Sequence, residues 1–167
     1  MNQLAQFRAQ KDDYFEHDHH SPLSAVQKRN FDGLNYFVEN PDLRMEIQLE
    51  RFDPIDHVQI QTNTGEVQTY ERYGCFRFTL DGEEIQLTVF RNEHGFFLPF
   101  TDSLAGEETY GAGRYLEPEE LGQNRLLIDF NLAYNPYCAY NENWSCPITP
   151  PENRLRVPIR AGEKSFK

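Results

Sequence analysis

Residues 76–89 read FRFTLDGEEIQLTV and decide the fold class of this 167-residue chain. Apolar and polar side chains alternate up to Asp81-Gly82, and a second alternating run follows that pair. Side chains of a strand point to opposite faces with a period of two, so each run is typical of a half-buried strand. Asp-Gly between such runs favours a two-residue turn, because both central residues need positive φ. The stretch therefore predicts an antiparallel β-hairpin.

Further strands are expected along the chain, separated by turn signals. The remaining alternating or short apolar runs lie at 43–49, 58–60, 67–69, 96–100, 126–130 and 155–159. No helical pattern lies between them, which argues against parallel βαβ units. The sequence therefore predicts a mainly β fold, an antiparallel meander that forms a barrel or a sandwich.

One or two short helices are expected before the strands. Residues 2–16 place apolar side chains near one helical face, and Lys11 can lay its methylene stem along the same stripe. Ser21-Pro22 predicts the start of a second helix, with Ser as N-cap and Pro at the first helical position. Leu23 and Val26 would then face inward, and Gly33 would end the turn.

We expect one domain made of three segments. Residues 1–33 form the helical segment, residues 34–100 the β-meander, and residues 101–167 an irregular segment rich in Tyr, Pro and Asn that carries the motifs. The acidity is uneven, because residues 1–108 hold 9 basic and 20 acidic side chains whereas residues 109–167 hold 7 of each. This asymmetry indicates a solvated scaffold followed by an ordered covering segment.

Composition and charge argue against several classes of protein and of partner. The chain has 16 Lys and Arg against 27 Asp and Glu, a net charge of −11, which argues against nucleic acid as a partner. Its hydrophobic content of 38% is too high for a disordered segment. No apolar run is long enough to span a membrane, and no apolar signal segment begins the chain. We therefore expect a soluble, cytoplasmic protein with no membrane partner, and the composition is compatible with a homo-oligomer.

The histidines and cysteines leave several interpretations open. The cluster at His17, His19 and His20 has no partner ligands at a characteristic spacing, so we expect no metal site there. Cys138 and Cys146 are too far apart in sequence for a CxxC redox pair. We expect the two residues to lie close in space. They are either unreactive buried thiols, a reversible disulfide or a shared metal site, or Cys138 is a nucleophile. No particular cofactor is indicated.

Arg114 and Asp129 are the strongest polar candidates in the last third of the chain. Arg114 follows Gly111-Ala112-Gly113, where the backbone can approach other segments closely, and Asp129 ends the apolar run 126–128. Arg114 would bind an anionic group of a ligand, or form an internal ion pair with a carboxylate such as Asp102, Glu108 or Asp129. We expect Arg114 and Asp129 to share one polar cavity walled by Tyr134 and Tyr137.

Several long strings resemble one known family. They are GEETYGAGRYL at 106–116, DFNLAYNPYCAY at 129–140 and PPENRL at 150–155. The chain resembles the DUF1684 family, bacterial and archaeal proteins known as a domain of unknown function. The likeness extends upstream to residues 21–37 and so covers nearly the whole chain. The resemblance implies no activity, and the histidine cluster and Cys75 depart from the family pattern.

Two classes of function remain open for residues 102–153. In the first, a polar pocket binds a small anionic ligand or catalyses a reaction, with Arg114, Asp129 and Cys138 as the catalytic candidates. In the second, a Tyr- and Pro-rich surface serves a non-catalytic interaction module, or the polar side chains form an internal structural network. The ligand-binding candidates in the first are Glu108, Tyr110, Tyr115, Asn131, Tyr134, Asn135, Tyr137 and Asn153.

Overall fold

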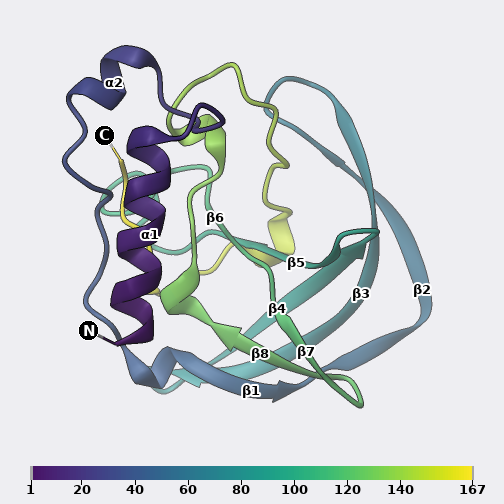
Figure 1. Cartoon of the computed structure of the whole chain (residues 1–167). Coiled ribbons are helices and arrows are strands. Elements are labelled where there is room, and N and C mark those ends of the chain that lie inside the picture. Colours follow the sequence, from purple (N-terminus) through teal and green to yellow (C-terminus); the bar gives the residue numbers. More distant parts are fainter. Residues whose placement is uncertain (1, 167) are drawn as a thin grey trace.

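A computed structural model describes residues 2–166, whose strands form two antiparallel sheets (Figure 1). Within these residues the larger sheet is a sequential meander in the order β2-β3-β4-β5-β6, and the smaller sheet has the order β1-β8-β7. The larger sheet comprises β2 (Glu50–Gln61), β3 (Val67–Leu80), β4 (Glu83–Asn92), β5 (Gly95–Phe100) and β6 (Arg114–Leu116). The smaller comprises β1 (Arg44–Gln48), β7 (Glu119–Gly122) and β8 (Arg125–Asp129). The mainly β, antiparallel prediction is confirmed, with the sheets not closed into a barrel.

The predicted hairpin is present between β3 and β4. Leu80 pairs with Glu83 across the turn, and Phe78 pairs with Ile85. Asp81 and Gly82 have φ values of 52° and 80°, the left-handed conformation that this two-residue turn requires.

The main core lies between the two sheets, as in a sandwich. Ile47, Leu126 and Ile128 of the smaller sheet pack against apolar side chains of the larger sheet. Each large apolar side chain that is fully buried contributes about 1.5–3 kcal/mol. The larger sheet contributes Tyr73, Phe76, Leu87, Val89, Leu98, Phe100 and Leu116.

The N-terminal helices lie outside the sheets, beside the loops of the last third of the chain (Figure 1). Helix α1 (Gln3–His17) begins at Asn2, whose side chain accepts a hydrogen bond from the Ala5 N–H, and it buries Phe15. Its 15 residues carry several charges, and no helix among residues 2–166 is long and apolar enough to cross a membrane.

The second helix begins later than Ser21-Pro22 predicts. Helix α2 (Ala25–Arg29) is capped by Ser24, which forms a reciprocal capping box with Gln27. Ser21 instead donates its hydroxyl to the Phe15 carbonyl. Leu23 is buried as expected, but Val26 is exposed, because the helix starts after Leu23 and turns Val26 outward.

The predicted strand at 155–159 is absent from the described residues. This segment follows the turn Pro151–Asn153 and runs as irregular coil with a bend at residues 156–157. The Leu155 N–H donates to the Thr101 carbonyl, and the Ile159 N–H donates to the Asp102 carboxylate. Pro158 has no backbone N–H to donate to a neighbouring strand. The alternation of apolar and polar residues at 155–159 therefore does not produce a paired strand. Three further short 3-10 turns span Pro41–Leu43, Phe130–Leu132 and Tyr137–Ala139.

Candidate functional site

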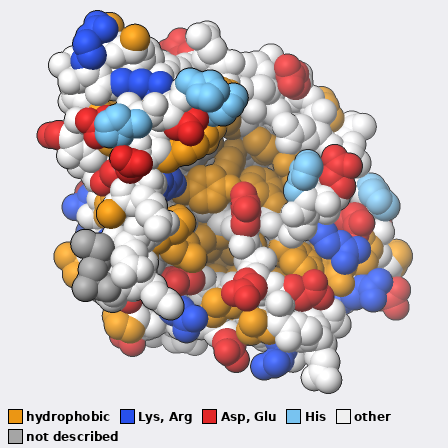
Figure 2. Space-filling view, viewed as in Figure 1, with side chains coloured by type: hydrophobic (Ala, Val, Ile, Leu, Met, Phe, Trp, Pro, Cys, Tyr) orange, Lys and Arg blue, Asp and Glu red, His pale blue; other side chains and the backbone are white. Residues whose placement is uncertain are grey.

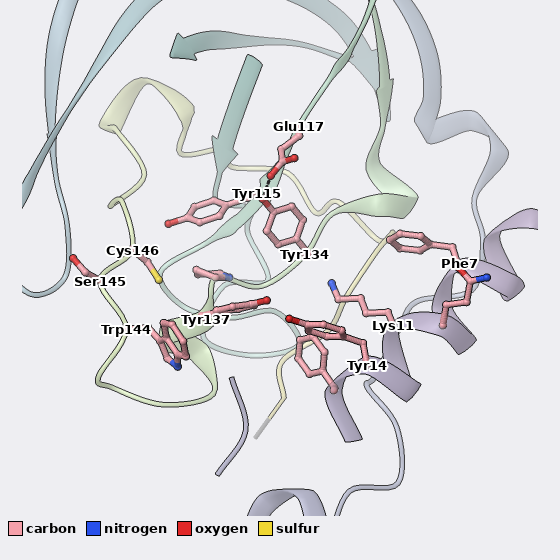
Figure 3. Close-up of a pocket in the computed structure, with 13 residues that line it drawn as sticks. Phe7, Lys11, Tyr14, Tyr115, Glu117, Tyr134, Tyr137, Trp144, Ser145 and Cys146 are labelled. Carbon is pink, nitrogen blue, oxygen red and sulfur yellow. Dashed lines mark hydrogen bonds between the residues drawn. The ribbon is translucent and has the colours of Figure 1, made fainter. Parts of the chain in front are cut away.

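A pocket of about 610 Å³ opens between helix α1, strand β6 and the loops that follow β8. Figure 2 shows it as a hollow whose floor is formed mainly by hydrophobic side chains. Its lining combines residues far apart in the sequence, as Figure 3 shows. The lining residues are Phe7, Gln10, Lys11, Tyr14, Phe15, Tyr115, Glu117, Tyr134, Pro136, Tyr137, Trp144, Ser145 and Cys146.

Four aromatic side chains form the inner wall. The rings of Tyr115 and Tyr134 lie 5.9 Å apart at 88°, and those of Tyr137 and Trp144 lie 5.1 Å apart at 71°. Such edge-to-face arrangements are favoured by the ring quadrupoles. The backbones of Tyr115 and Tyr134 exchange two hydrogen bonds, and the Tyr115 hydroxyl donates to the Pro147 carbonyl. The wall is therefore fixed by packing and by hydrogen bonds.

One net negative charge faces the pocket. Lys11 Nζ pairs with the buried Glu163 carboxylate and lies 5.1 Å from the centre of the Tyr134 ring. Opposite, the Tyr134 hydroxyl donates to Glu117 Oε1 at 2.7 Å. Burial raises the pKa of Tyr134, and the hydrogen bond to the Glu117 carboxylate raises that pKa further. With Lys11 neutralised by Glu163, Glu117 is the net charge that faces the pocket.

Cys138 and Cys146 lie together beside this wall, which confirms their expected proximity. The Cys138 N–H donates to Cys146 Sγ at 3.4 Å, and the Tyr110 hydroxyl lies 3.7 Å from Cys138 Sγ. A hydrogen bond from the Cys146 thiol is the main cause that lowers the pKa of Cys138 to about 6, and the Tyr110 hydroxyl adds to it. The same hydrogen bond and burial raise the pKa of Cys146. All three cysteines of the chain are free thiols.

Arg114 is buried away from the pocket. Its guanidinium donates to the carbonyls of Ile159, Ala161 and Glu163, and Nη2 lies 3.6 Å from Asp102 Oδ2. Burial lowers the pKa of Arg114 to about 10, and the Asp102 carboxylate opposes that shift. Of the partners that the sequence allows for Arg114, the structure selects Asp102.

The structure does not bring Arg114 and Asp129 together, which corrects the expectation of one shared cavity. Asp129 lies 3.7 Å from Arg44 Nε and accepts hydrogen bonds from the N–H and side chain of Asn131. Strand β8 ends at Asp129, so its side chain caps the following 3-10 turn. Asp129 lines a smaller cavity of about 240 Å³ on the side of Tyr134 that faces β7 and β8.

The comparisons with known proteins agree with this architecture. The sequence model of DUF1684, described as "Protein of unknown function", matches residues 29–164. The chain belongs to the DUF1684 family. It is also similar to an uncharacterized protein of Haloarcula marismortui, whose solution NMR structure it matches with 36% identity and a TM-score of 0.73, over 97% of this chain and 92% of that chain. None of the curated proteins matches it.

Most polar residues of the DUF1684 motifs hold the backbone of the loops. Asn153 is fully buried and joins Thr88 to Pro99, accepting from the Thr88 N–H and donating to both carbonyls. Asn131 bonds the backbone of Asn40 in the same two-way manner, and Asn135 donates to the Lys164 carbonyl. Glu108 is exposed and pairs with Arg160 at 2.6 Å. The asparagine contacts, but not the exposed Glu108–Arg160 pair, correspond to the internal network that the sequence left open as an alternative.

Part of the pocket was missed by sequence reasoning. Of the predicted ligand-binding residues, Tyr115, Tyr134 and Tyr137 line it. Lys11 and the aromatic side chains of α1 come from outside the matched DUF1684 residues, and Glu117 and Trp144 lie between the motif strings. The available sequence signal was the apolar stripe of residues 2–16. In the structure, Phe7 and Tyr14 of that stripe remain 44% and 37% exposed and line the pocket.

The remaining histidines lie elsewhere on the surface. Asp18, His19 and His20 place one ligand atom each within 4.8 Å of one another, but both histidines are exposed. His57 and His94 line a separate, polar depression together with Arg91, which pairs with Glu71 at 2.8 Å.

Proposed function

We propose that this DUF1684 chain binds a small, mainly apolar organic molecule in the pocket beneath α1. The single observation that carries the proposal is the fixed wall of Tyr115, Tyr134, Tyr137 and Trp144 around a space of about 610 Å³. Sites for small molecules are usually concave, largely apolar and roughly 300–1,000 Å³ in volume. Rigid aromatic rings also bind planar ligands with little loss of side-chain freedom.

The charges favour a ligand with a cationic or hydrogen-bond-donating group. Glu117 offers carboxylate oxygens at the rim, whereas the Lys11 ammonium is already paired with Glu163. An organic cation would gain from both the carboxylate and the negative faces of the tyrosine rings. The sequence-based expectation of an anionic ligand depended on Arg114, whose guanidinium binds Asp102 and three backbone carbonyls inside the protein and does not line the pocket.

A ligand pocket is favoured over a flat interaction surface by the placement of the tyrosines. A docking surface needs exposed aromatic anchors, but Tyr115, Tyr134 and Tyr137 are buried or half-buried and face a hollow. The aromatic side chains that stay exposed there, Phe7, Tyr14 and Trp144, line the same hollow and do not form a flat patch.

Trp144 provides the test, because it is the only tryptophan of the chain. Phenethylamine, 2-phenylethanol and phenylacetate share one ring size and differ in charge, and they leave tryptophan excitation undisturbed. We expect Trp144 fluorescence to respond to phenethylamine most strongly, then to 2-phenylethanol, and least to phenylacetate. Glu117→Gln should remove the preference for the amine, whereas Val38→Ala, at a position 88% exposed, should leave it unchanged.

Two results would overturn the proposal. No response of Trp144 to any of the three probes, together with no shift in the melting temperature, would contradict a ligand pocket. A stronger response to phenylacetate than to phenethylamine would replace the cationic assignment with an anionic ligand.

A further inference from the structure

The cysteine pair lies at a junction that several segments fix independently. Cys138 sits in the 3-10 turn Tyr137–Ala139, which begins after Pro136. Cys146 is held from the opposite side, because its N–H donates to Asn63 Oδ1 at 2.7 Å and its carbonyl accepts from the Asn63 N–H at 3.1 Å. The proximity of the two thiols is therefore built into the fold, not a result of one mobile loop.

The two thiols differ in access and in bonding. Cys138 is half-buried and has the Tyr110 hydroxyl 3.7 Å from its sulfur, whereas Cys146 is buried and lines the pocket. A thiolate at Cys138 would accept a hydrogen bond from the Tyr110 hydroxyl, and the Cys146 sulfur lies 3.4 Å from the Cys138 backbone nitrogen. Cysteine reactivity rises with the stability of the thiolate. A half-buried thiol next to a second thiol is also the arrangement found in cysteines that sense oxidants.

We propose that Cys138 and Cys146 form a peroxide-reactive dithiol that closes to a reversible disulfide, with Cys138 as the attacking sulfur and Cys146 as the resolving one. This site is independent of the ligand proposal, since its chemistry requires no molecule in the pocket. Cys75 is the internal contrast: it is buried on β3, and burial raises the pKa of its thiol.

The reaction has two balanced steps. The Cys138 thiolate attacks one oxygen of a hydroperoxide, the S–O bond forms as the O–O bond breaks, and the second oxygen leaves as hydroxide or alkoxide. Sulfur loses two electrons to the peroxide and becomes a sulfenic acid. The Cys146 sulfur then attacks Cys138 Sγ, the S–S bond forms, the S–O bond breaks, and the hydroxyl leaves as water with the Cys146 proton.

Hydrogen peroxide and the reduced protein, with a chelator present, provide the first test. We expect two of the three thiols to disappear, the intact mass to fall by two hydrogens, and the linked peptide to contain residues 138 and 146. A thiol reductant should restore both thiols. Cys75→Ser should react like the parent chain, Cys138→Ser should not react, and Cys146→Ser should accumulate a sulfenic acid at Cys138 that dimedone traps.

The pH profile separates an activated thiolate from an ordinary thiol. The titratable groups that face Cys138 are Tyr110, Cys146 and Tyr115. The rate of Cys138 oxidation should level off above about pH 6, whereas the rate for an ordinary thiol continues to rise toward pH 8.5. Tyr110→Phe removes one donor without removing the ring, so it should lower the rate at pH 6 several-fold and move the plateau to higher pH.

Either of two outcomes would overturn the inference. One is a rate at Cys138 no faster than at Cys75 in the parent chain, which needs no variant to fold. The other is sulfenic acid at Cys138 that persists in the parent chain without forming the 138–146 disulfide.

Discussion

Arg114 Nη2 lies 3.6 Å from Asp102 Oδ2, and each side chain is only 1% exposed. Asp102 also accepts from the Thr109 hydroxyl and the Ile159 N–H, so its charge is fully enclosed by donors. Arg114 stands at the start of β6 and reaches the carbonyls of residues 159, 161 and 163. The pair therefore fastens the covering segment to the larger sheet.

Replacing this guanidinium should cost stability. Arg114→Lys keeps the charge but cannot reproduce the fork of donors, so we expect a loss of about 2–4 kcal/mol in the free energy of unfolding. Arg44→Lys is the matched control, because Arg44 is 59% exposed and pairs with Asp129 at 3.7 Å, and its effect should stay below about 0.5 kcal/mol. Urea unfolding of both variants measures the two losses in the free energy of unfolding. Equal losses would show that the Arg114 network adds little to the stability of the protein.

Lys11→Met should loosen helix α1. It leaves the Glu163 carboxylate buried without its direct ion pair, with the Tyr140 hydroxyl at 2.8 Å and the Asn135 N–H at 3.3 Å as hydrogen-bond donors. We expect a loss of about 2–4 kcal/mol, since an uncompensated buried charge is costly. The double variant with Glu163→Gln should recover part of that loss, and hydrogen exchange should be fastest in α1. Additive losses would contradict a direct coupling.

Gly113→Ala tests the close approach of two loops. A Cβ at Gly113 would lie 2.6 Å from the Phe100 carbonyl oxygen and 2.7 Å from Thr149 Oγ1, and the residue has φ of +106°. Gly95 has φ of +118° with nothing within 4 Å of its added Cβ, so Gly95→Ala carries the backbone strain alone. Thermal unfolding should show Gly113→Ala to be less stable than Gly95→Ala by about 1–3 kcal/mol. Equal stability would mean that the loop moves away at no cost.

Alkaline titration should unfold the protein and ionise buried tyrosines together. Burial raises the pKa of Tyr36, Tyr70, Tyr110, Tyr115, Tyr134, Tyr137 and Tyr140. A group whose folded pKa is raised stabilises the fold below its unfolded pKa of about 10 and loses that contribution as pH rises above it. Tyrosinate absorbance and circular dichroism should therefore change in one coincident step above pH 10. Complete tyrosine ionisation in a still folded protein would contradict the burial of these hydroxyls.

Local patterns predicted the sheets well because they act through neighbouring residues. The turn at Asp81-Gly82 and the alternation on both sides of it fix register without help from distant parts of the chain. The segment 155–159 has the same alternation and is not a strand, since its backbone groups bond to Thr101 and Asp102. Alternation indicates which face is buried, and pairing depends on whether a free strand edge is available.

The pocket was harder to predict because its parts meet only in three dimensions. The tyrosines at 115, 134 and 137 were candidates because they lie in the motif-bearing segment. Glu117 is an ordinary surface charge in sequence, and Lys11 was expected only to lay its stem along the apolar stripe of the first helix. Arg114 was a candidate from the sequence but does not line the pocket. An arginine beside glycines is compatible both with binding a ligand and with pairing to a buried carboxylate. The structure pairs Arg114 with Asp102, which lies two residues after the end of β5 and whose carboxylate also binds the Ile159 N–H. The packing of residues 159–163 that creates this arrangement is not visible in the sequence.

The contacts of Arg114 also constrain when the protein can fold during its synthesis. Its three carbonyl partners lie 45 to 49 residues later in the chain. Glu163, whose carboxylate pairs with Lys11 of the first helix, is 152 residues away from that lysine. A nascent chain that has released only the strands would hold an Arg114 guanidinium that lacks its three carbonyl acceptors, and a first helix without its Glu163 ion pair. Completion of the core must therefore wait until residue 163 has left the ribosome, and chaperones have that interval in which to act.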